Sequence, residues 1–226
     1  MTVPAPDPRE VRAASRDELQ RLGLPPLPAQ FPLVWEPGDK VTLRPTAELE
    51  ARLAVLNVVL ARCYGMPQEA AMSWLLSARL VESLTRPEWQ FVIADKGDRR
   101  ALALHLEAIN GLTWLLGVTP HLDPAQPAAE GLVDTLPDLR KAETMDHWRS
   151  RTLVAPRDAP TAAAMLDLYY CLDWAYLEAE RHRSRLPGVI DSHTIGQRRW
   201  ALEWAVTLVG PYHDPPRGWE EIDLST

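Results

Sequence analysis

The chain has 226 residues, 46% of them hydrophobic and 24% charged, which is an ordinary composition for a globular protein with a sizeable core. Its net charge of −7 argues against nucleic-acid binding, which needs a basic surface. No stretch approaches the about 18 consecutive apolar residues of a membrane span and the N-terminus lacks a secretory signal, so we expect a cytoplasmic protein.

Proline marks the boundaries of the predicted elements. Residues 1–44 predict a Pro-rich N-terminal arm with one short helix, in which Asp7 is the N-cap, Pro8 lies in the first turn and Gly23 ends the helix. The segment 41–44 predicts a brief strand. Residues 45–210 are the predicted helical core domain, and residues 211–226 are a C-terminal tail.

Helical periodicity and capping signals divide the core further. Gly65 ends its first helix, Thr85 has capping-box spacing to Glu88, Asp98 caps the most apolar helix, and Ser192 caps the last. Since there is no βαβ alternation, we predict an all-α, single-domain bundle of six to eight helices. The expected helices cover residues 45–64, 67–82, 85–93, 99–116, 142–150, 158–185 and 192–209.

Four of the nine tryptophans occupy similar places in these helices. Trp74, Trp114, Trp174 and Trp204 each follow a polar residue and precede aliphatic or small residues. Trp carries a large apolar area and an N–H that needs a partner when buried, so we expect these four to anchor a tryptophan-rich core. Nine tryptophans are many for one core, which leaves open a homo-oligomer that buries some of them.

The C-terminal third has a recognisable order of motifs. Residues 167–175 (DLYYCLDWA) contain a Tyr-rich Leu-x-Trp-Ala pattern, Pro187-Gly188 breaks the helix, and residues 197–204 (QRRWALEW) follow. This order resembles a widespread bacterial family of domains of unknown function, over roughly residues 42–209. The resemblance implies an all-helical fold and brings no activity, cofactor or catalytic residue. The chain departs from the family's pattern at Cys171, Asp173 and Glu203.

Polar residues interrupt the apolar stripes of the predicted helices. Glu107 and Asn110 lie in the most apolar helix, where a carboxylate must be paired or protonated. Arg199 lies on the apolar stripe of the last helix and can bind a carboxylate through two hydrogen bonds. We therefore predict a buried polar cluster that either specifies helix packing or lines a ligand pocket. Its candidates are Glu107, Asn110, Asp167, Asp173, Glu178, Arg199 and Glu203.

Motifs for catalysis are scarce. The sequence contains no Gly-rich phosphate loop, Gly-x-Ser-x-Gly elbow or His-Glu-x-x-His motif, and we predict no cofactor. Glu178 and His182 have the spacing of weak metal-ligand candidates, although an ordinary helical pair is the stronger interpretation. We expect a binding protein without catalytic activity, whose partner is another protein or a small molecule. The alternative is a hydrolase-like enzyme that uses carboxylates such as Glu107 with a histidine or a metal.

Overall fold

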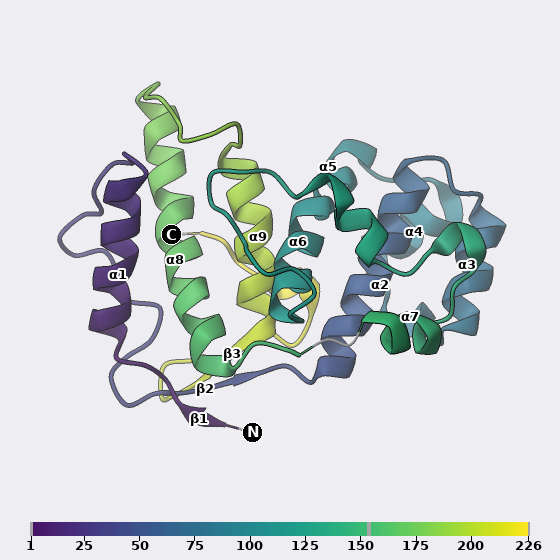
Figure 1. Ribbon diagram of the computed structural model, residues 1–226, viewed down its shortest axis with the longest axis horizontal. Helices are drawn as coiled ribbons and strands as arrows, with labels where there is room; N and C mark the ends of the chain where they lie inside the picture. The colour runs from purple at the N-terminus through teal and green to yellow at the C-terminus, as the bar shows by residue number, and fades with distance from the viewer. Residues whose placement is uncertain (1, 153–154, 226) are drawn as a thin grey trace. The chain divides into compact units, whose positions relative to one another are not determined.

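The protein is mostly helical, as the sequence predicts. The computed structural model describes residues 2–152 and 155–225, which include nine α-helices and one small sheet (Figure 1). No helix in these two ranges is long and apolar enough to cross a membrane. The helices are α1 (Pro8–Arg21), α2 (Thr46–Cys63), α3 (Gln68–Ser77), α4 (Arg86–Ala94), α5 (Arg99–Ala103), α6 (His105–Leu115), α7 (Met145–Thr152), α8 (Ala159–Arg181) and α9 (Ser192–Ala205).

The chain divides into two compact units. Unit 1 comprises the described residues of Met1–Arg44, His121–Pro127 and Arg157–Thr226, and unit 2 comprises those of Pro45–Pro120 and Ala128–Pro156. The chain passes from unit 1 to unit 2 after Arg44, and residues of the predicted core domain 45–210 belong to both units. The arm and the C-terminal tail both lie in unit 1, together with α8 and α9.

Side-chain caps begin several helices where the sequence predicts them. Asp7 accepts hydrogen bonds from the backbone N–H groups of Arg9 and Glu10, and Thr85 and Glu88 form a reciprocal capping box. Asp98 caps α5 as Asp7 caps α1, by accepting hydrogen bonds from the backbone N–H groups of Arg100 and Ala101. These caps satisfy N–H groups that have no partner within the helix. The last helix differs from the prediction, because Asp191 rather than Ser192 is its N-cap.

The apolar stretch after Asp98 forms two helices instead of the single helix expected over residues 99–116. The backbone N–H of Leu104 donates to Ala101 O, and that of Glu107 donates to Leu104 O. These bonds join residues three apart, as in a 3₁₀-helix, and they separate α5 from α6. In unit 2, α6 packs against α2, and every residue from Glu107 to Leu115 is buried. The most apolar stretch of the sequence is therefore buried mainly in its second helix, α6.

A three-stranded antiparallel sheet lies in unit 1. It joins β1 (Val3–Pro4), β2 (Lys40–Leu43) and β3 (Val206–Val209) in that order. The sequence predicts the brief β2 strand but predicts a helix through Val209, and the second prediction is wrong. Residues of β3 pair with β2 from Leu43↔Val206 to Lys40↔Val209. Three of its four residues are β-branched, which favours extended backbone when a partner strand is present.

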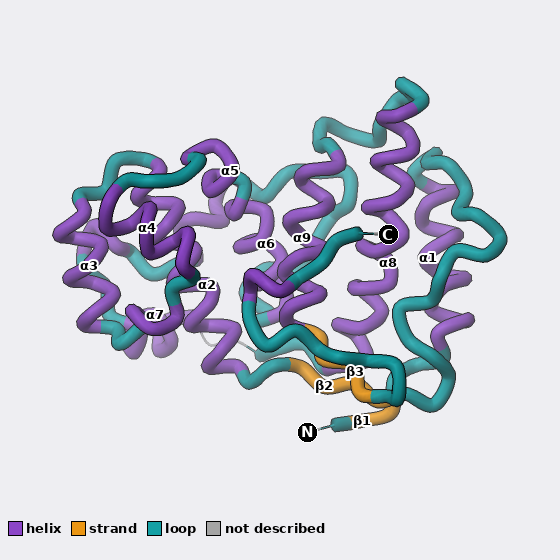
Figure 2. The backbone as a smooth tube through the Cα atoms, turned by 180° about the vertical axis from the view of Figure 1, so that it is seen from behind, coloured by secondary structure: helices purple, strands orange, loops and turns teal. Residues whose placement is uncertain are grey.

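Within unit 1, α8 lies between α1 and α9. Both helices contact α8, and the three run side by side in Figure 1. The strands contact α8 as well and lie near one end of it in Figure 2. This arrangement places the polar side chains of α8 against two neighbouring helices, which decides the pairs described below.

Burial of the predicted tryptophan anchors is uneven. Trp74, Trp114 and Trp204 are buried, whereas Trp174 is half-buried with its ring 5.7 Å from that of Phe31. Further buried tryptophans lie outside the predicted pattern, among them Trp35, Trp148 and Trp219. Sequence periodicity does not reveal Trp35 or Trp219, because both lie outside α-helices.

Candidate functional site

Arg199 is the centre of a buried polar cluster in unit 1. Its Nη1 donates to Asp173 Oδ2 at 2.7 Å, and its Nε donates to Glu203 Oε1 at 3.2 Å. Nη1 also donates to the carbonyl of Leu224 in the C-terminal tail. The Arg199 side chain is only 2% exposed. The structure thus joins one carboxylate of α8 and one of α9 through a single guanidinium.

A second buried pair also lies near Tyr170. Arg12 of α1 donates from Nη2 to Asp167 Oδ1 at 2.7 Å, and Ser15 donates to the other oxygen of Asp167 at 2.7 Å. The guanidinium carbons of Arg199 and Arg12 lie 4.6 and 5.8 Å from the centre of the Tyr170 ring. Sequence reasoning missed Arg12, although it shares a helical face with Ser15 and the buried Leu19.

The two carboxylates around Arg199 are perturbed by burial. Burial raises the pKa of Asp173, and hydrogen bonding to Arg199 opposes that rise without cancelling it. Burial likewise raises the pKa of Glu203, again opposed by Arg199. One guanidinium therefore stabilises two carboxylates that are both partly removed from water. Such an arrangement occurs both in structural ion-pair networks and in functional sites.

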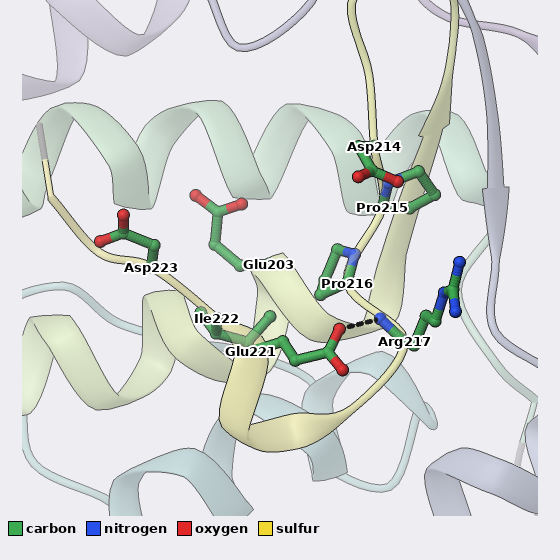
Figure 3. A pocket seen from close by; sticks show the side chains of 8 residues that line it. All are labelled: Glu203, Asp214, Pro215, Pro216, Arg217, Glu221, Ile222 and Asp223. Carbon is green, nitrogen blue, oxygen red and sulfur yellow. Dashed lines mark hydrogen bonds between the residues drawn. The ribbon is translucent and has the colours of Figure 1, made fainter.

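A pocket of about 500 Å³ adjoins this cluster in unit 1. Figure 3 shows Glu203 with the side chains of the C-terminal segment around it. Glu221 accepts a hydrogen bond from the backbone N–H of Arg217. No group of three or more metal-ligating side chains occurs here or elsewhere among the described residues. The pocket is lined by Glu203, Asp214, Pro215, Pro216, Arg217, Glu221, Ile222 and Asp223.

The remaining predicted residues lie elsewhere. Glu178 hydrogen-bonds to His182 at 2.8 Å on the surface of α8, and neither residue lines a described pocket. Glu107 and Asn110 are buried in unit 2, where Glu107 accepts a hydrogen bond from the backbone N–H of Ala128 at 3.0 Å. A network that joins these two residues to Arg199 stays a prediction.

Unit 2 has a larger pocket, of about 920 Å³. The second half of α2 contributes one wall, and η3 (Leu139–Lys141) and α7 contribute others. Its apolar lining residues are Leu60, Ala61, Tyr64, Leu106, Val133, Leu136, Pro137 and Leu139. A pocket of this size that combines apolar surface with polar groups is typical of a small-molecule site.

Glu143 organises the polar side of this pocket. Its Oε1 lies 2.6 Å from His147 Nδ1 and accepts from Arg151 Nε at 2.7 Å. Its Oε2 accepts from Arg151 Nη2 at 2.9 Å and from the backbone N–H of Asp138 at 2.8 Å. Hydrogen bonding to Arg151 is the main reason that the pKa of Glu143 falls to about 2. Glu143 is therefore an ionised, fully engaged carboxylate at neutral pH.

Sequence reasoning missed Glu143, His147 and Arg151. Their four-residue spacing is the only signal in the sequence, and it does not differ from that of Glu178 and His182. Glu143 precedes α7, whose first turn is capped by Thr144 through the backbone N–H of His147. The start of α7 thus fixes where the three side chains project.

The sequence model of one protein family matches residues 11–222, nearly the whole chain. The family is described as a domain of unknown function, DUF4272, and the description assigns no activity. None of the curated proteins compared with the chain matches it, and none of the solved structures does. The function must therefore be argued from the geometry of the chain itself.

Proposed function

This chain belongs to the DUF4272 family, and because the description of that family assigns no activity, we propose its function from the chain's own residues. It binds a small, partly apolar molecule in the pocket of unit 2. The observation that carries this proposal is the cavity of about 920 Å³, whose lining combines apolar side chains with charged ones. That volume lies within the range of roughly 300–1,000 Å³ that small-molecule sites occupy. The partner is thus a small molecule, in preference to a protein or a nucleic acid.

Exposed apolar side chains at the pocket support the proposal. Tyr64 and Val133 both line the cavity, and they are 78% and 53% exposed. Large apolar side chains on a surface cost free energy in water, and their concentration at a concavity is typical of a binding site. A ligand with an apolar body would cover both residues.

Charged groups at the pocket would orient the ligand. Lys141 pairs with Asp138 at 3.0 Å, and Glu143 is engaged by Arg151. Among the residues that the structure describes, Arg140 and Asp134 line the pocket and have no ion-pair partner. Their charges are therefore available to polar ends of a bound molecule.

The proposed setting is the cytoplasm of a bacterial cell. Cys63 and Cys171 are buried and unpaired, which suits a reducing compartment. Self-association through exposed aromatic side chains stays a prediction, and light scattering on the purified protein tests it.

Fluorescence of anilinonaphthalene sulfonate tests ligand binding, because this probe combines apolar rings with one anionic group. Ala61→Phe places a large side chain in the pocket and should weaken the saturable binding about tenfold or more. Ala70→Phe is the matched control, since Ala70 is exposed on α3 and does not line the pocket. Equal probe affinity in both variants, with unchanged circular dichroism, contradicts the proposed site.

A further inference from the structure

His147 and Glu143 form a carboxylate–imidazole pair that opens on the pocket of unit 2. Histidine Nδ1 lies 2.6 Å from an oxygen of Glu143, and the imidazole is 69% exposed. His147 also lines the cavity of about 920 Å³. Building on the proposed function, we propose that this pair makes the pocket a hydrolytic centre for carboxylic esters with an apolar acyl group, in which His147 is the general base.

The environment of Glu143 decides which imidazole nitrogen carries the proton. Glu143 is ionised at neutral pH, because Arg151 and the Asp138 N–H stabilise its charge. A charged carboxylate accepts hydrogen bonds and does not donate them, so Nδ1 must carry the hydrogen. In the neutral imidazole Nε2 then has the lone pair, and no hydrogen-bond partner for Nε2 occurs in the described parts of the chain. Orientation of a basic imidazole by a carboxylate is the general arrangement of catalytic histidines.

Comparison with other His–carboxylate pairs singles out His147. His182 pairs with Glu178 at 2.8 Å, and His213 pairs with Asp39 at 2.7 Å. Neither of these two histidines lines a described pocket, whereas His147 does. A general base needs a bound substrate within reach, and among these His–carboxylate pairs only that of His147 combines the base with a cavity for the substrate.

The proposed reaction is direct attack by water. None of the described residues that line the pocket is Ser, Thr or Cys, so the described lining offers no aliphatic hydroxyl or thiol as a nucleophile. His147 Nε2 removes a proton from water while the water oxygen bonds to the ester carbonyl carbon. The carbonyl electrons move to oxygen, and the resulting tetrahedral anion collapses with cleavage of the carbon–alkoxide bond. The imidazolium returns its proton to the alkoxide, which gives one acid and one alcohol.

The pocket supplies two further requirements of this reaction. Leu60, Leu106 and Leu139 provide apolar surface for the acyl group. Arg140 has a positive charge with no ion-pair partner among the described residues and would stabilise the anionic intermediate. The other charged groups that line the pocket with His147 are Asp134, Asp138, Arg140, Lys141, Glu143 and Arg151.

Hydrolysis of para-nitrophenyl butanoate by the full-length protein tests the inference. His147→Gln should lower kcat/KM by at least tenfold, since general bases contribute roughly 10²–10⁴-fold. It should also abolish the rise of the rate with pH that reports a neutral imidazole. His182→Gln is the matched control, because it removes an equally exposed histidine from the same kind of helical pair outside the pocket. This control should retain the wild-type rate.

Glu143→Gln tests the positioning role of the carboxylate. It should lower kcat and leave KM unchanged, because Glu143 is engaged by Arg151 and His147 and acts on the substrate only through the imidazole. A loss of packing around α7 would raise KM instead, and circular dichroism would detect a loss of helix.

The possible results separate this inference from the proposed function. Equal rates in His147→Gln and His182→Gln, or a wild-type rate no higher than that of free imidazole, overturn the hydrolytic centre. If anilinonaphthalene sulfonate still binds in that case, the binding function stands. If the probe does not bind the wild-type pocket, the proposed function itself fails. Retained probe binding in His147→Gln together with lost hydrolysis supports both.

Discussion

Asp167→Asn removes the negative charge from a buried ion pair in unit 1. The side chains of Arg12 and Asp167 are 4% and 1% exposed, and no second carboxylate is described at Arg12. Asparagine keeps the size of the side chain, so the substitution changes charge with little change in packing. The guanidinium of Arg12 stays charged in the variant, because arginine keeps its proton in proteins. In the unsubstituted protein burial opposes this charge, and hydrogen bonding to Asp167 together with electrostatic attraction to neighbouring groups outweighs burial and raises the pKa of Arg12.

The size of the effect follows from what remains around Arg12. Removal of one partner from a buried ion pair costs roughly 3–5 kcal/mol, since the other charge is left uncompensated. Two carbonyl oxygens, of Phe31 and Pro32, still accept hydrogen bonds from Nη1 at 3.3 and 2.9 Å. The rings of Phe31 and Tyr170 also stay near the cation. We therefore expect the lower end of the range, about 3 kcal/mol of lost unfolding free energy.

Urea unfolding followed by tryptophan fluorescence measures this loss. At a slope of about 2 kcal/mol per molar urea, the midpoint should fall by about 1.5 M. Glu178→Gln is the control, because it breaks a surface pair with Arg181, whose side chain is 71% exposed, and should cost less than about 1 kcal/mol. Midpoint shifts of the same size in both variants would refute the argument that burial makes the Arg12 pair indispensable.

Two further substitutions and one labelling experiment probe other parts of the structure. The pKa of Glu143 is lowered from 4.5 to about 2, so its contribution to stability is present above about pH 4.5 and is lost as the pH falls towards 2; Glu143→Gln should flatten the decline of the urea midpoint between about pH 5 and about pH 3. Gly188 has φ +69° and faces Ala125 O. An added Cβ at Gly188 would therefore be strained, whereas one at Gly131 would enter open space. Gly188→Ala should lower the thermal midpoint well below that of Gly131→Ala, and equal midpoints would contradict backbone strain at Gly188. Burial raises the pKa of Cys171 to about 12 and also raises that of Cys63. Both thiols should resist dithiobis-nitrobenzoate at about pH 8 until urea is added, and rapid reaction of the folded protein argues against their burial.

Local chemistry in the sequence was sufficient to place most helices. Asp7, Thr85 and Asp98 cap helices because a short polar side chain satisfies backbone N–H groups two or three residues ahead. Gly23 and Gly65 follow the ends of two helices with φ of 71° and 93°, a conformation that glycine adopts without strain. Interactions within a few residues determine these features, so one sequence is enough to predict them.

The polar pairs depended on distant segments. The sequence indicated that Arg199 faces the core and that a carboxylate of the long helix is a candidate partner. It could not choose among Asp167, Asp173 and Glu178, since all three lie on that helix. The fold decides, because α1 brings Arg12 to Asp167 and α9 brings Arg199 to Asp173. Likewise, Val206 extends a helical pattern in the sequence but belongs to β3, because it pairs with Leu43.

The candidate hydrolytic pair shows the same limit most clearly. Glu143 and His147 have the same spacing as Glu178 and His182, so the sequence by itself did not distinguish the two pairs. Only the tertiary structure decided that one pair borders a cavity and the other faces solvent. The cavity walls come from α2, α6 and the segment before α7, which are far apart in the chain and meet only through packing.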